Sequence, residues 1–149
     1  MDHPLLNTEA PEFSLLDQEG HEVTLGAVLP KHKLVLVFYP GDETPGCTAQ
    51  LCAIRDEWAD FLAVNIMVYG VNAGNAESHT KFWRHHGLKT PLLVDTGSKV
   101  AEKYAAVQNI LGKKIIHRTV VLVDQQGIIR YYHRGMPSPK EIIAAGQNV

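Results

Sequence analysis

KLVLVFYPGDETPGCTAQLC, residues 33–52, decides how the rest of the chain is interpreted, because it joins a strand to a helix through a short turn. Its first seven residues are almost continuously apolar, which is typical of a central strand that is buried on both faces. A Pro-Gly pair ends this strand. Thr44 is then a favourable N-cap, and Pro45 a favourable first residue, for a helix. The only two cysteines of the chain, Cys47 and Cys52, both lie in this predicted helix.

The segments around this stretch alternate between strand and helix patterns. We expect one domain over residues 1–149 with an α/β fold and a mixed sheet, because the hairpin near its end must be antiparallel. Further predicted elements are an N-terminal hairpin over 13–25, a helix over 45–64, a strand over 65–73, a helix from Asn75 to Gly87, a strand over 91–95, a helix over 98–106, a hairpin over 117–134 and a helix capped by Ser138.

Composition excludes several classes of function. The chain carries a formal net charge of −2. It therefore lacks the strong positive electrostatic field that would attract nucleic acid or an anionic membrane. It has no run of about 18 apolar residues, and its first residues lack the pattern of a secretory signal. We therefore expect a cytoplasmic protein, in which a cysteine pair is more often catalytic, redox-active or metal-binding than structural.

Cys47 is expected to be the reactive thiol. It falls in the first turn of the predicted helix, where unpaired N–H groups and the helix dipole stabilise a thiolate. Gly46 leaves room for a small molecule to approach the backbone closely. At about 100° per residue, Cys47 shares the apolar face of the helix with Leu51 and Ile54, so it is expected to point toward the sheet.

Cys52 lies about 140° further around the same helix than Cys47. Helix geometry separates the Cα atoms of residues i and i+5 by about 8.7 Å, whereas a disulfide requires about 4.4–6.8 Å. The two thiols can therefore form a bond only if the first turn of the helix unwinds.

Other uses of these residues fit less well. Buried cysteines are often simple core residues, although the helix start and the neighbouring glycine argue against that here. A phosphatase would need an arginine six residues after Cys47, and Arg55 comes two positions too late. The adjacent His85 and His86 are poorly arranged for chelation, so we expect no metal or organic cofactor. Asp95 begins an Asp-Thr-Gly triplet that we interpret as a turn.

The stretch FYPGDETPGCTAQLCAIRD resembles the peroxiredoxins, specifically the bacterioferritin-comigratory-protein or Q-type group. That family carries a Pro-x-x-x-Thr-x-x-Cys motif, which Pro40, Thr44 and Cys47 match. Cys52 matches the second cysteine of the Q-type group, and Arg118, near the start of a later predicted strand, matches the family's active-site arginine. The resemblance runs from about residue 8 to the C-terminal helix. It implies a thioredoxin-like fold with a central mixed sheet, flanking helices and an N-terminal β-hairpin.

Two positions depart from the family pattern. Gln50 stands where many relatives have glutamate, and Val121 stands where an aromatic residue is common. Both alter the surroundings of the reacting groups rather than the groups themselves, so the expected chemistry is unchanged.

The resemblance implies a thiol peroxidase that acts on hydrogen peroxide and alkyl hydroperoxides. Cys47 would become a sulfenic acid, Cys52 would form an intramolecular disulfide with it, and thioredoxin or a similar dithiol would reduce that bond. Arg118 would stabilise charge on the leaving oxygen, Thr44 would bond to the peroxide and Pro40 would shield the sulfur. The group is often monomeric, so we expect a monomer.

Two alternatives use the same thiols. A thioredoxin-class thiol-disulfide reductase is disfavoured because four residues, rather than two, separate the cysteines. A peroxide-sensing redox switch would expose a binding surface when the helix unwinds. Sustained turnover would distinguish an enzyme from such a switch.

Overall fold

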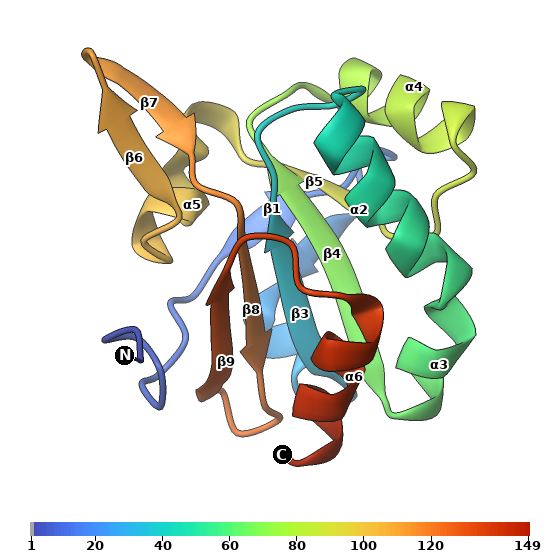
Figure 1. The fold of residues 1–149 in the computed structure, drawn as a ribbon, viewed down its shortest axis with the longest axis vertical. Helices are drawn as coiled ribbons and strands as arrows, with labels where there is room; N and C mark the ends of the chain where they lie inside the picture. The colour runs from blue at the N-terminus through green and yellow to red at the C-terminus, as the bar shows by residue number, and fades with distance from the viewer. Residues whose placement is uncertain (1) are drawn as a thin grey trace.

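The computed structural model describes residues 2–149 and is built around a five-stranded mixed sheet in the order β5-β4-β3-β8-β9 (Figure 1). The strand β3 is central, parallel to β4 and antiparallel to β8. The strands of this sheet are β3 (Lys33–Phe38), β4 (Ile66–Asn72), β5 (Leu92–Val94), β8 (Thr119–Val123) and β9 (Ile129–Arg134). This arrangement confirms the predicted mixed sheet and closing hairpin.

Both faces of the sheet are covered. Alternate residues of β3 point to opposite faces, so Leu34 and Leu36 enter one core while Val35 and Val37 enter the other. The second core lies under α2, α3, α4 and α6, and the first lies under the N-terminal hairpin, α1 and α5. The helices are α1 (Leu25–Val28), α2 (Pro45–Asp56), α3 (Trp58–Ala63), α4 (Ala76–His85), α5 (Lys99–Lys103) and α6 (Pro139–Gln147).

Side-chain caps fix several predicted helix starts. The Asn75 side chain accepts a hydrogen bond from Ser78 N at the start of α4, and Ser138 accepts one from Glu141 N at the start of α6. The predicted N-terminal hairpin is also present, as a separate two-stranded sheet of β1 (Ser14–Leu16) and β2 (Glu22–Thr24).

Three elements differ from the sequence predictions. The helix expected over 45–64 is divided at Glu57, whose φ of −108° and ψ of 17° separate α2 from α3. The short helix α1 was not predicted. Nor was the hairpin of β6 (Val107–Ile110) and β7 (Lys113–Ile116), which projects from the body of the molecule. Residues of this hairpin are mostly exposed, so the burial pattern that identifies a core strand is missing.

The register of the central strands positions the site. Phe38, the last residue of β3, pairs with Thr119, the first residue of β8. Because this pairing is antiparallel, the residue after the end of β3 and the residue before the start of β8 meet at the same end of the sheet. Pro40 and Arg118, far apart in sequence, consequently lie together where α2 begins.

Candidate active site

Cys47 lies in the first turn of α2 with its side chain in the core. The residue is completely buried and packs in the cluster formed by α2, α3, α4, α6 and one face of the sheet. Leu51 and Ile54 belong to the same cluster, as the helical periodicity predicts. The sulfur therefore faces the core rather than solvent.

Thr44 precedes α2 in the extended conformation of an N-cap residue, with φ −77° and ψ 145°. Its hydroxyl does not cap the helix, contrary to expectation. Instead, Thr44 Oγ1 donates a hydrogen bond of 2.9 Å to the carbonyl oxygen of Gly41. The contact closes the turn between the strand and the helix, and it leaves the first N–H groups of α2 without this side chain as a partner.

Arg118 packs its guanidinium group against Gly46, the residue before Cys47. A Cβ atom at Gly46 would lie only 2.6 Å from Arg118 Nη2 and 3.2 Å from Cζ. Such distances are well below van der Waals contact, so glycine is required for this approach. The other terminal nitrogen, Nη1, lies 3.6 Å from Met136 Sδ. The guanidinium group is thus held beside the backbone of the first turn.

A surface pocket of about 470 Å³ lies beside these residues. Pro40 and Arg118 line it together with Arg134 and the β7 residues Ile115 and Ile116. Two guanidinium groups give the pocket a cationic wall, while the isoleucines give it an apolar one. This composition suits a small polar group with an alkyl substituent.

Cys52 lies within the same uninterrupted helix as Cys47. Its side chain is half-buried, and both thiols are free. The helical separation of about 8.7 Å between Cα atoms therefore applies, and it exceeds the span of a disulfide. A bond between the two requires that α2 unwind at its start.

A buried hydrogen-bond network behind the turn was not predicted from the sequence. Asp42 Oδ1 accepts a bond of 2.7 Å from the Tyr39 hydroxyl, and Asp42 Oδ2 accepts one of 2.6 Å from Ser78 Oγ. The same Oδ2 lies 2.7 Å from Nδ1 of His79, whose Nε2 lies 3.1 Å from the carbonyl oxygen of Leu93. Since a carbonyl only accepts, the Asp42–His79 pair must keep a proton between Nδ1 and Oδ2. The network anchors the Pro40–Thr44 turn to α4.

The charges in this network follow from burial and hydrogen bonding. Burial, followed by the Asp42 charge, raises the pKa of Tyr39 well above its ordinary value, so the phenol remains a donor. Burial works to raise the pKa of Asp42, but the bonds from His79, Ser78 and Tyr39 outweigh it and lower that pKa. Asp42 is consequently ionised at neutral pH.

Replacing His79 by alanine is expected to destabilise the protein by about 3–5 kcal/mol, because it leaves the buried Asp42 carboxylate without its main partner. The side chains of His79 and Asp42 are 0% and 6% exposed. Urea unfolding followed by circular dichroism measures the change. The matched control is His21→Ala, which removes a 71% exposed histidine beside Asp17 and should cost no more than about 0.5 kcal/mol. Equal effects of the two substitutions would contradict a structural role for the network.

Because the pKa of Asp42 is lowered, the stabilisation that the Asp42–His79 pair gives the folded protein depends on pH. A carboxyl group whose pKa is lower in the folded protein stabilises it at pH values above the unfolded value of about 3.9, and this contribution is lost as the pH falls further. We expect the stability difference between wild type and His79→Ala to narrow below about pH 4.

Gln50 and Val121, the two departures from the family pattern, are both buried. Within residues 2–149, neither the Nε2 nor the Oε1 atom of Gln50 has a hydrogen-bond partner. A buried amide without partners costs about 1–3 kcal/mol. Val121 is a core residue of β8 on the face opposite Cys47.

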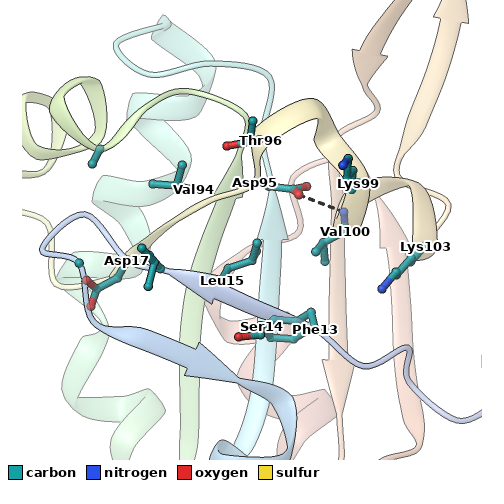
Figure 2. A pocket seen from close by; sticks show the side chains of 13 residues that line it. Phe13, Ser14, Leu15, Asp17, Val94, Asp95, Thr96, Lys99, Val100 and Lys103 are labelled. Carbon is teal, nitrogen blue, oxygen red and sulfur yellow. Dashed lines mark hydrogen bonds between the residues drawn. The ribbon is translucent and has the colours of Figure 1, made fainter.

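Figure 2 shows a pocket of about 530 Å³ that neither cysteine lines. It lies between β1, the end of β5 and α5, and none of the five predicted site residues lines it. One of its two buried carboxylates, Asp95, accepts hydrogen bonds from Val100 N at 3.0 Å and Ala101 N at 2.9 Å. The Asp-Thr-Gly triplet is thus a structural turn that starts α5, as predicted.

Comparisons with known proteins identify the family. Residues 6–132 match the AhpC/TSA family. The chain belongs to this family. Within this family, the chain belongs to the peroxiredoxin Q/BCP group. The chain is 36% identical over 134 residues to the chloroplastic peroxiredoxin Q of Oryza sativa subsp. japonica, covering 90% of the chain and 61% of the rice protein.

Two further relatives support this membership. The chloroplastic peroxiredoxin Q of Sedum lineare is 36% identical over 133 residues, covering 89% of this peroxiredoxin and 70% of the relative. The crystal structure of Peroxidoxin BcpB from Mycobacterium tuberculosis superposes with a TM-score of 0.90 at 26% identity, covering 99% of each chain. The thioredoxin-like fold expected from the resemblance is therefore confirmed. Among residues 2–149 of this peroxiredoxin, no helix is long and apolar enough to cross a membrane.

Proposed function

We propose that this peroxiredoxin is a thiol-dependent peroxidase that reduces hydrogen peroxide and alkyl hydroperoxides. The observation that carries the proposal is the contact between the Arg118 guanidinium group and Gly46, directly before Cys47 at the start of α2. The arrangement sets a sulfur nucleophile beside donors that can stabilise a leaving oxygen anion. Family membership and the pocket beside Pro40 and Arg118 support the same function.

In the first step, the Cys47 thiolate attacks one peroxide oxygen and the O–O bond breaks. The sulfur becomes a sulfenic acid, and the other oxygen leaves as hydroxide or alkoxide, which takes a proton to give water or an alcohol. Arg118 and the N–H groups of the first turn stabilise the negative charge on the leaving oxygen. Thr44 bonds to the peroxide, and Pro40 shields the sulfur from bulk water.

In the second step, the Cys52 thiolate attacks the sulfenic sulfur of Cys47, and the sulfenic hydroxyl leaves as water after protonation. The product is an intramolecular disulfide, formed after the start of α2 unwinds. An external dithiol, which we propose to be thioredoxin, transfers two electrons and restores both thiols. We further propose that residues 1–149 act as a monomeric single domain in the cytoplasm, where thiols are kept reduced.

The test is stopped-flow oxidation of the reduced protein by hydrogen peroxide, followed by mass spectrometry of the product. One equivalent of peroxide should give a Cys47–Cys52 bond, and thioredoxin with its reductase should then support many turnovers. Oxidation without renewed turnover would instead favour a redox switch.

Cys52→Ser is expected to leave the first oxidation intact and to stop thioredoxin-linked turnover. Without the second thiol, the sulfenic acid at Cys47 persists and can be trapped by a dimedone probe. Serine is the matched replacement, because it changes little besides the nucleophile. Unchanged steady-state turnover in this variant would refute the resolving role of Cys52.

A further inference from the structure

Three side chains outside the peroxide site converge beside the turn that carries it. Glu43 Oε2 lies 2.8 Å from His85 Nδ1, and Glu43 Oε1 lies 2.6 Å from His86 Nε2. Each of the three residues offers one ligand atom, and these three atoms all lie within 4.8 Å of one another. Two imidazoles and one carboxylate are a ligand set that zinc commonly takes.

The backbone explains why adjacent histidines can meet at one carboxylate. His85 is the last residue of α4, whereas His86 has left the helix with φ −107° and ψ 6°. The two rings also use different nitrogens, Nδ1 and Nε2, and so reach the two oxygens of one carboxylate from adjacent positions. Glu43 has a φ of 60°, rare for a residue other than glycine. The adjacent pair was expected to be poorly arranged for chelation, whereas the structure brings one nitrogen of each ring to the Glu43 carboxylate.

The histidine end of the cluster is held by its surroundings. The His86 side chain is only 22% exposed, and its ring lies edge-on to Phe82 with centroids 5.4 Å apart. Its carbonyl oxygen accepts a hydrogen bond from Arg55 Nη1 of α2. At least one imidazole is therefore oriented before any ligand arrives, which lowers the cost of binding.

We propose that Glu43, His85 and His86 bind a Zn²⁺ ion, with water in the fourth position. Zinc bonds of about 2.0–2.2 Å in a tetrahedral geometry separate ligand atoms by about 3.4 Å. The observed separations of 2.6 Å and 2.8 Å for the two carboxylate–imidazole pairs need to open by less than about 1 Å. The exposed side of Glu43 and His85 gives the ion and its water access from solvent.

Zinc at this site would join α4 to the turn that starts α2, because Glu43 directly precedes the N-cap residue Thr44. This consequence rests on the proposed function, in which α2 must unwind before Cys52 reaches Cys47. If unwinding requires release of the ion, free Zn²⁺ at about 100 times its dissociation constant slows disulfide formation about 100-fold.

Zinc binding is measured in a variant without the two thiols, because cysteine thiolates are themselves zinc ligands. The untagged Cys47→Ser/Cys52→Ser double variant is titrated with zinc chloride by isothermal calorimetry, and one equivalent should bind. Adding Glu43→Gln, or His85→Ala with His86→Ala, should weaken binding more than about tenfold, since even losing a group that only orients a ligand costs 10–100-fold. The matched control is His21→Ala, which removes a histidine that contacts Asp17 but has no second imidazole beside it and should leave binding unchanged.

Two outcomes would overturn the zinc site: no binding by the double variant, or binding that the Glu43 and histidine substitutions leave unchanged while circular dichroism shows a folded protein. Neither outcome depends on peroxidase activity, so failure of this site is distinguishable from failure of the proposed function.

The effect on the catalytic cycle is measured with both cysteines present. Disulfide formation after a single peroxide pulse is compared with and without zinc, in wild type and in the His85→Ala/His86→Ala variant. If zinc slows disulfide formation in wild type but not in the variant, the result supports the proposal that zinc at this site opposes the unwinding of α2. Equal slowing in both proteins would show that zinc acts at the thiols, and would reject that link.

Discussion

Cys47→Ser is expected to abolish peroxide consumption completely. Serine keeps the size of the side chain and the start of α2, but its hydroxyl does not ionise near neutral pH and cannot form a sulfenic acid. The measurement is loss of hydrogen peroxide in the presence of excess dithiol, together with a count of oxidised thiols by mass spectrometry.

The control for this loss is the fold of the variant. Cys47 is completely buried, so unfolding in urea should be compared with wild type to exclude a loss of structure. Residual thiol-dependent consumption by the folded Cys47→Ser variant, at more than a few per cent of wild type, would assign the reactive sulfur to Cys52 instead.

Arg118→Ala is expected to slow sulfenic acid formation by about 100- to 1,000-fold, the usual cost of losing one donor that stabilises a developing oxyanion. Ionisation alone cannot explain a fast thiol peroxidase. An ordinary thiol with a pKa of about 8.5 is already about 3% ionised at pH 7, so complete ionisation gains only about 30-fold. Stopped-flow oxidation by hydrogen peroxide measures the step directly. A loss smaller than about 30-fold would contradict a dominant role in stabilising the leaving oxygen.

Gly46→Ala supplies a second test of the same contact. The new methyl group would meet Arg118 Nη2 at 2.6 Å, and the flexible guanidinium side chain should move rather than the backbone. A displacement of about 1 Å at a catalytic group can cost about 100-fold in rate. In the Arg118→Ala background the same methyl group should have little effect. Similar losses in both backgrounds would mean that the methyl group acts on the first turn itself.

The sequence was most informative where local rules suffice. The apolar run before Pro40 predicted a buried central strand, and Asn75 and Ser138 cap helices where expected. The helical period correctly predicted that Cys47 faces the core. These features depend on residues a few positions apart, so propensity and periodicity reveal them.

Features that depend on distant residues were missed or misjudged. The bond from His79 to Asp42 joins α4 to the turn before α2, and no local pattern pairs those residues. The convergence of His85 and His86 on Glu43 needs the end of α4 beside that turn, a consequence of packing. The break between α2 and α3 at Glu57 could not be predicted from the sequence either, because the helical spacing of apolar residues continues from α2 into α3. Tertiary contacts override local preference at such positions.

The pairing of Phe38 with Thr119 has a consequence for the newly synthesised protein. A ribosome releases Cys47 long before it has made Arg118, so an emerging chain carries the thiol without its guanidinium partner. In the mechanism proposed above, fast reaction with peroxide requires Arg118, so it would begin only after β8 joins the sheet. On the same proposal, an unfinished polypeptide would carry Cys47 without the group that makes it reactive, and its thiol would be oxidised more slowly than that of the complete protein.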